Sequence, residues 1–309
     1  MKEAMQIDPA QNLTSAPVSR RTVLGALVAT GFGATAIAQE GQRRREELQE
    51  PVFRQAARNN DDPKRIKRAP HPLDEAIEIA EGALKNMQEN YDDYTAVLYK
   101  RERVGGVTGD EEVANVKIRN RKELNGTITQ AFSVYITFVK PAKIAGREAL
   151  YVEGANNGKM IGHKGKGEGV LTMSAWLLPT SHLAMAGQLY PITEIGIENL
   201  ILKLIERGNK ERQHADVDVK WTESKIFDRK CRVLTLSHEK KEPHFDFHKA
   251  QIFIDKDFNV PVRYVAYDWP KGEKLAKSDI LEEYTYTQLK FNVGLTDKDF
   301  DSRNKSYNF

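Results

Sequence analysis

The sequence predicts a mainly β protein of the α+β class, built on a strongly curved antiparallel sheet that forms a half-barrel. Apolar and polar residues alternate over many short runs after residue 94, which is the period of strands with one buried face. Turn sequences such as Asn125-Gly126 separate the runs and favour hairpins. A sheet of this many antiparallel strands has to curl or close, because twist accumulates and bare edges aggregate.

The first element of the predicted domain is an amphipathic helix that ends near Asn90. Pro72 suits its first turn. Apolar residues follow at helical spacing, namely Leu73, Ala76, Ile77, Ala80, Ala83, Leu84 and Met87. We expect residues 72–301 to form one domain, followed by a short C-terminal tail, 302–309.

Two strongly apolar segments interrupt the strands in the middle of the chain. Residues 174–187 and 192–207 both have a helical period, and Gly208 suits the end of the second helix. We expect these two apolar helices to pack in the concave face of the sheet. About five strands precede them and about six follow, at 217–221, 225–228, 231–238, 245–254, 260–267 and 281–293.

The first 38 residues are predicted to be a bacterial export signal. Arg20 and Arg21 precede a modestly apolar run, and with Ser19 they resemble the twin-arginine consensus, which implies export by the twin-arginine machinery after folding. The small residues Ala36 and Ala38 predict cleavage after Ala38, and hence a periplasmic or other extracytoplasmic location. The alternative is an uncleaved signal segment that anchors the chain. That segment is the only membrane contact expected.

Residues 39–71 form a charge-dense stretch with few large apolar residues, which predicts a flexible linker. Over the whole chain the net charge is +3, with acids and bases interspersed. No basic stripe carries the aromatic residues that bind single-stranded nucleic acid, so a nucleic-acid partner is not predicted. Cys231 is the only cysteine, which excludes an intrachain disulfide and a cysteine-based zinc site.

An apolar ligand cavity is predicted between the curved sheet and the apolar helices. Its candidate lining residues are large apolar side chains of these elements, namely Phe132, Ile136, Trp176, Leu177, Leu183, Met185 and Leu200. A helix that is apolar all round is also typical of plain core packing. The sequence has no motif of a hydrolase, a metalloprotease or a nucleotide-binding enzyme, so no catalytic residue and no organic cofactor is predicted.

The stretch PHFDFH allows two interpretations. If it is a strand, His244, Asp246 and His248 lie on one face, about 6.6 to 7 Å from one another in turn. His244 and His248 are then candidates to hold a divalent metal, with a further ligand such as His163 or His238 from a neighbouring strand. The alternative is a polar rim above an apolar cavity.

Three longer stretches, residues 71–104, 244–270 and 282–301, resemble an uncharacterised bacterial family called domain of unknown function 1571. This resemblance covers about residues 72–301 and implies no activity. The order of elements, and the hairpin from Ile254-Asp255 to Val260-Pro261, is also similar to the half-barrel of the lipoprotein carrier LolA and its relatives. That resemblance implies a bent antiparallel sheet around an apolar cavity that helices plug.

Three functions follow as hypotheses. The first is an exported, non-catalytic binding protein that holds an acyl chain or another apolar ligand. The second is a metal-dependent enzyme that uses His244 and His248. The third is an envelope interaction or sensing module that contacts a protein through the exposed face of its sheet.

Overall fold

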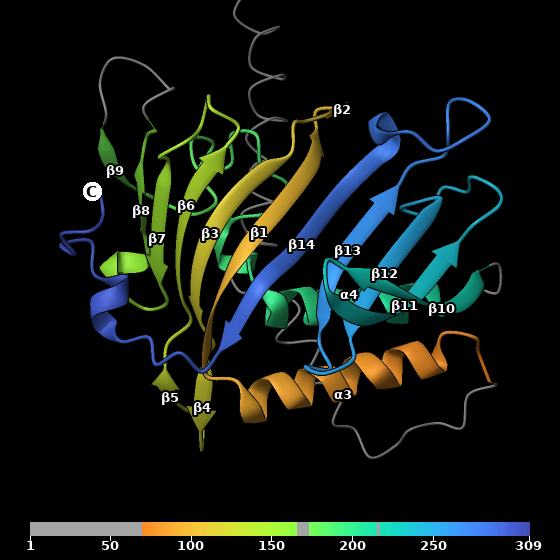
Figure 1. Ribbon diagram of the computed structural model, residues 1–309, viewed down its shortest axis with the longest axis horizontal. Coiled ribbons are helices and arrows are strands. Elements are labelled where there is room, and N and C mark those ends of the chain that lie inside the picture. The colour runs from red at the N-terminus through yellow and green to blue at the C-terminus, as the bar shows by residue number, and fades with distance from the viewer. Residues whose placement is uncertain (1–69, 166–172, 215–216) are drawn as a thin grey trace, which may run out of the picture. The chain divides into compact units, whose positions relative to one another are not determined.

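A computed structural model describes residues 70–165, 173–214 and 217–309. Its main element is an open sheet of 12 strands, strongly curved and antiparallel, as the sequence predicts (Figure 1). The strands follow the order β10-β11-β12-β13-β14-β1-β3-β6-β7-β8-β9, β2 pairs with β1, and β4 and β5 form a separate hairpin. Their bounds are β1 (Asp93–Val104), β2 (Val107–Thr108), β3 (Glu112–Arg119), β4 (Lys122–Leu124), β5 (Thr127–Gln130), β6 (Ser133–Lys140), β7 (Glu148–Val152), β8 (Met160–His163), β9 (Ser174–Leu177), β10 (Asp218–Ile226), β11 (Arg229–Ser237), β12 (Lys249–Asp255), β13 (Pro261–Tyr267) and β14 (Ile280–Phe291).

The two 12-residue strands, β1 and β14, lie side by side in the middle of the sheet. Leu98 pairs with Tyr286, and Glu102 pairs with Glu282. Because side chains alternate across a strand, every second residue faces the concave side. The main apolar core lies there and includes Tyr94, Ala96, Leu98, Ala114, Val116, Ile118, Val134, Ile136, Ile252 and Tyr264.

Two α-helices, α3 (Asp74–Asn90) and α4 (Ile197–Glu211), pack against each other and against β11, β12 and β13. Gly208 allows this close packing, because a Cβ atom there would lie 3.1 Å from Cγ1 of Ile77. The predicted N-terminal helix is confirmed. The predicted helix over 192–207 is confirmed as a short 3-10 turn, Ile192–Glu194, followed by α4.

The helix predicted over residues 174–187 is wrong. Ser174–Leu177 form the edge strand β9, which pairs with β8, and the chain then runs through turns as far as Gly187. Pro179 gives the physical reason, because its ring disfavours helical backbone at Leu178 and its nitrogen donates no hydrogen bond. The part of the run that becomes β9 is only four residues long, too short for its period to separate a strand from a helix.

The strand predicted over 245–254 begins later than expected, at Lys249. Residues 243–248 form a turn and bends in which Phe245 and Phe247 are buried and Asp246 is exposed. Phe245 stacks on the buried ring of His238, with 3.7 Å between the ring centroids. The alternation of polar and aromatic residues over 244–248 therefore belongs to a loop, in which Phe245 and Phe247 point into the interior. The two strands predicted at 217–221 and 225–228 are one strand, β10.

Residues 302–309, the predicted tail, pack on the side of the sheet opposite the main core. The ring of Tyr307 stacks on that of Tyr135 with 3.8 Å between centroids, and the backbone N–H of Asn308 donates to Glu148. A second apolar cluster with Leu150 lies here. Within the described ranges, no helix has the length and apolar character needed to cross a lipid bilayer.

Candidate ligand-binding cavity

A cavity of about 450 Å³ lies on the concave side of the sheet, against β14, β1 and β6 to β9. The start of α4 and the connection that precedes it, residues 178–196, line it from the other side. We call this connection the covering segment. Most of the lining is apolar, and the volume is typical of sites for small molecules.

A row of small residues makes room for the cavity. Ala149 on β7, Gly162 on β8 and Ala175 on β9 pair directly across the three strands, and all three line the cavity. A Cβ atom built at Gly162 meets nothing closer than 3.8 Å, so the space beside it is open. Large side chains in this row would fill the space that α4 and the covering segment leave.

Four of the seven predicted lining residues line the cavity: Ile136, Leu177, Leu183 and Leu200. The other three do not. Phe132 is a buried core residue. Trp176 is next to Leu177 on β9, so its side chain points to the opposite face, where it is 44% exposed. Met185 is half-buried in the covering segment and is not part of the lining.

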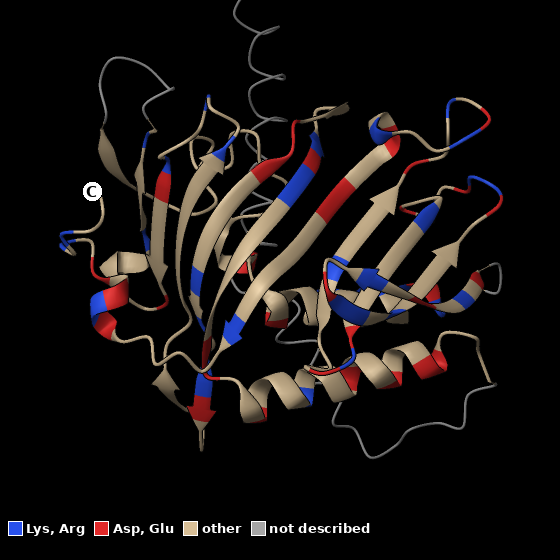
Figure 2. Ribbon diagram, viewed as in Figure 1, with Lys and Arg blue, Asp and Glu red and all other residues tan. Residues whose placement is uncertain are grey.

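Polar side chains cross the concave face where β1 and β14 meet, and Figure 2 shows charged positions of both strands next to each other there. We call this group the polar band. Its members on the sheet are Lys100, Glu102, Glu112, Tyr264, Glu282 and Tyr284, and those on the covering segment and α4 are Gln188, Tyr190, Glu194, Lys203 and Arg207.

Lys100 and Glu102 form the first part of the polar band. Nζ of Lys100 donates to Oε2 of Glu102 over 3.1 Å and to Gln188, and lies 3.7 Å from Glu112. The hydroxyl of Tyr284 donates to Oε1 of Glu102 over 2.5 Å. Burial, and then the charge of Glu102, raises the pKa of Tyr284 far above its ordinary value. The phenol therefore stays protonated and acts as a donor.

Glu282 is the centre of the second part. It accepts hydrogen bonds from Nη1 of Arg207 over 2.6 Å and from the hydroxyl of Tyr190 over 2.9 Å. Arg207 also donates to the hydroxyls of Tyr190 and Tyr264. Both oxygens of the buried carboxylate thus have donors, as a buried charge requires.

The third part is the pair of Lys203 and Glu194, both of which line the cavity. Nζ of Lys203 lies 3.5 Å from Oε2 of Glu194 and over the ring of Tyr190. Burial lowers the pKa of Lys203 to about 8 and raises the pKa of Glu194. The two side chains form an ion pair that is largely shielded from water.

Polar contacts also hold the covering segment in position. The backbone N–H of Leu189 donates to Glu102 over 3.0 Å. At the start of α4, the N–H groups of Gly196 and Ile197 donate to the hydroxyls of Tyr286 and Tyr94 over 3.1 and 2.8 Å. The segment that closes the cavity is therefore attached to β1 and β14 by hydrogen bonds as well as by apolar packing.

Sequence reasoning missed the polar band and the row of small residues. A signal for the band was present in residues 100–103, KRER, because neighbouring residues of a strand face opposite sides and two of these charges had to face the core. The row of small residues left a weaker signal, since Ala149, Gly162 and Ala175 stand where a large apolar residue would be usual.

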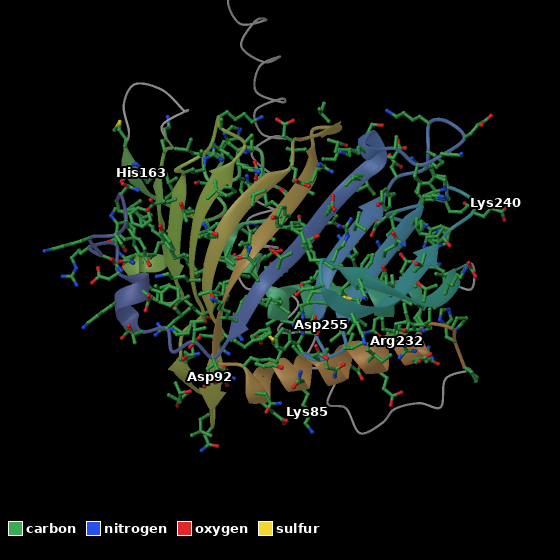
Figure 3. All side chains as sticks on the ribbon, viewed as in Figure 1. Lys85, Asp92, His163, Arg232, Lys240 and Asp255 are labelled. Carbon is green, nitrogen blue, oxygen red and sulfur yellow. The ribbon has the colours of Figure 1, made fainter. Side chains whose placement is uncertain are left out.

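The two candidate metal ligands lie in the loop before β12 and not on a strand. His244 stacks on His214 with 4.0 Å between ring centroids, and Nδ1 of His248 lies 2.7 Å from the carbonyl oxygen of His238. The other suggested ligand, His163, lies at the far edge of the sheet, where it is labelled in Figure 3, and contacts Ser174. In the parts of the chain that the structure describes, no group of three or more His, Cys, Asp or Glu side chains is placed to hold a metal ion.

The predicted export signal with Arg20 and Arg21, the cleavage positions Ala36 and Ala38, and most of the predicted linker lie outside the described residues. They stay predictions.

The model of the family described as "Protein of unknown function (DUF1571)" matches residues 91–309. The comparison with curated proteins gives no match. Similar solved structures include a DUF1329 family protein from Desulfovibrio piger, at 12% identity over 75% of this chain and 98% of that chain, with a TM-score of 0.36. A LolA superfamily protein from Nitrosomonas europaea has 13% identity over 72% of this chain and 97% of that chain, with a TM-score of 0.28. A chain of the MucA/MucB complex from Pseudomonas aeruginosa has 15% identity over 74% of this chain and 61% of that chain, with a TM-score of 0.40. These likenesses are distant, and no function is transferred from them.

Proposed function

From its cavity we propose that this chain, which belongs to the DUF1571 family of proteins of unknown function, is a binding protein. Its ligand is an acyl chain or another apolar molecule, and the protein is non-catalytic. The observation that carries the proposal is the cavity of about 450 Å³ with its mainly apolar lining. Such a volume is far larger than the small voids of a close-packed core.

The energetics support binding of a chain. Each methylene moved from water into an apolar site contributes about 0.8 kcal/mol, so about 12 of them contribute on the order of 10 kcal/mol. The cost of association is of similar size. Net affinity then depends on how well the row of small residues and the opposing Leu200 fit the ligand.

We further propose that the protein binds its ligand outside the cytoplasm. This part rests on the paired arginines at 20 and 21 and on the small residues Ala36 and Ala38. Mass measurement of the mature chain from its host tests it, because cleavage after Ala38 leaves a chain that begins at Gln39.

The test of binding is native mass spectrometry of the protein purified from its own host without detergent. We expect extra mass of hundreds of daltons that organic extraction removes. Displacement of the neutral dye Nile red by added amphiphiles then gives affinities. The matched variants are neighbours on β9: Leu177→Trp should weaken binding because Leu177 lines the cavity, whereas Trp176→Leu should not. A bare chain that binds no added amphiphile contradicts the proposal.

A second candidate is the interaction module, which exposed apolar residues at the β9 edge favour. Met173, Leu178 and Leu183 are 62%, 53% and 61% exposed. Contiguous exposed apolar residues are typical of contact sites. Crosslinking in the host that captures one defined protein through Leu178, together with an empty cavity, would move this candidate to first place.

A further inference from the structure

The ionisable residues of the polar band are not balanced in charge. The band holds four carboxylates and three bases: Glu102, Glu112, Glu194 and Glu282 against Lys100, Lys203 and Arg207. Arg207 is matched to Glu282 and Lys203 to Glu194, so Lys100 serves both Glu102 and Glu112. Within the polar band the excess is therefore one negative charge, and the cavity lining also holds the bases Arg147 and Lys164 outside the band.

Glu194 is the member of the band whose charge a ligand can best complement. It lines the cavity, and Nζ of Lys203 lies 3.5 Å from its Oε2. Glu102, which also lines the cavity, accepts from Lys100, Leu189 and Tyr284. Burial raises the pKa of Glu194, and the charge and hydrogen bond of Lys203 act against this rise.

Three tyrosine rings line the same end of the cavity. The hydroxyls of Tyr190, Tyr284 and Tyr286 are all used in hydrogen bonds to protein groups, so a ligand meets their rings; one face of the Tyr190 ring is already occupied by Nζ of Lys203. A cation is attracted to the face of an aromatic ring, and Lys203 already lies over the ring of Tyr190. Rings beside carboxylates are the chemistry that recognises ammonium groups.

We propose that the cavity binds an amphiphile with an ammonium head, whose head lies at Glu194 among the rings of Tyr190, Tyr284 and Tyr286 and whose chain lies along the row of small residues. This inference rests on the proposed binding function and names its ligand class.

The opposite outcome has a structural basis too. Arg147, His163 and Lys164 also line the cavity, at the ends of β7 and β8. If the head of the ligand lay there, an anionic amphiphile would bind best. Equal chains with heads of different charge separate the two arrangements.

The experiment measures displacement of Nile red from the full chain by decyltrimethylammonium, decyl sulfate and 1-decanol, each below its micelle concentration. We expect the ammonium compound to bind at least about tenfold tighter than the sulfate. Glu194→Gln keeps the shape and removes the charge, so it should reduce this ratio about fivefold or more. Glu81→Gln removes a carboxylate from an exposed position of α3, away from the cavity lining, and should leave the ratio unchanged.

The failures are distinguishable. If none of the three compounds displaces the dye, the proposed binding function fails and this inference with it. If all three bind equally, or the sulfate binds best, the cavity binds amphiphiles but the ammonium head is refuted. A ratio that is unaffected by Glu194→Gln refutes the placement of the head at Glu194. The comparison of the three compounds uses the wild-type protein alone, so its result does not depend on whether a variant folds.

Discussion

Filling the cavity from Gly162 is expected to change ligand binding and stability in opposite directions. Gly162 lies in the middle of the row of small residues. Apart from the residues next to it in sequence, the side chains nearest to an added Cβ atom are those of Met160 and Leu177, at 3.8 and 4.0 Å. Its backbone has no positive φ that would strain another residue. Gly162→Leu therefore places four carbon atoms in open space.

The size of both effects follows from those four atoms. At about 30 Å³ each, they occupy about 120 Å³ of the cavity of about 450 Å³. A ligand that fills the cavity loses burial of about four methylenes, or about 3 kcal/mol, which weakens binding about 200-fold. The free protein instead buries a new apolar side chain and loses a flexible strand glycine, so it gains about 1 to 3 kcal/mol.

Urea unfolding and Nile red displacement by decyltrimethylammonium measure the two quantities on the same samples. Gly82→Ala is the control, because Gly82 lies in α3 with nothing within 4 Å of an added Cβ atom. It should raise stability by about 0.5 to 1 kcal/mol and leave binding unchanged. Unchanged binding in Gly162→Leu would show that ligands bind elsewhere. A loss of stability would show that the space beside Gly162 is not open.

Three further predictions concern stability. Burial lowers the pKa of Lys203 to about 8 from 10.5, so the unfolded chain binds more protons between these values and stability rises with pH. In urea titrations the wild type should gain about 1.5 kcal/mol over Lys203→Met between pH 8 and 9.5, and an absent gain contradicts the buried position. Asp255 is fully buried and accepts hydrogen bonds from Arg229 and two backbone N–H groups, which hold its pKa low although burial acts to raise it. Asp255→Ala should cost about 3 kcal/mol at pH 7, and the difference from wild type should shrink as the pH falls below 3.8; a neutral effect in chemical unfolding would refute this account. Deleting residues 302–309 removes the ring stacked on Tyr135 and should cost about 2 kcal/mol, seen as a lower melting temperature, whereas an unchanged value would make these residues a free tail.

The sheet could be predicted because its signal is local and repeated. The alternation at Ala114, Val116 and Ile118, followed by the Asn125-Gly126 turn, reports directly which side chains face the core. The same logic failed at residues 174–187, where Leu177, Leu178 and Pro179 read as part of a helix. An apolar run has no reliable period there, and pairing with β8, which sequence does not show, decided the outcome.

The site was predictable only in its apolar half. Ile136, Leu177, Leu183 and Leu200 were found because large apolar side chains on a curved sheet and its covering elements have to face inward. The polar band depends on which strands become neighbours. Glu102 and Glu282 lie far apart in the sequence and meet only because β1 pairs with β14, so neither residue could be assigned a partner beforehand.

The pairing of β1 with β14 also sets the order in which the chain can fold during synthesis. On one side of this junction β1, β3 and β6 to β9 follow one another as local hairpins, and on the other side β10 to β14 do the same. Each half can form from contacts near in sequence, but their junction has to wait until the last long strand has left the ribosome. Until then β1 is an unpaired edge, and its charged residues Lys100, Arg101, Glu102 and Arg103 are of the kind that keeps such an edge from joining other chains. Lys100 and Glu102, which later line the cavity, are thus among the charges that keep the incomplete sheet from pairing with other chains.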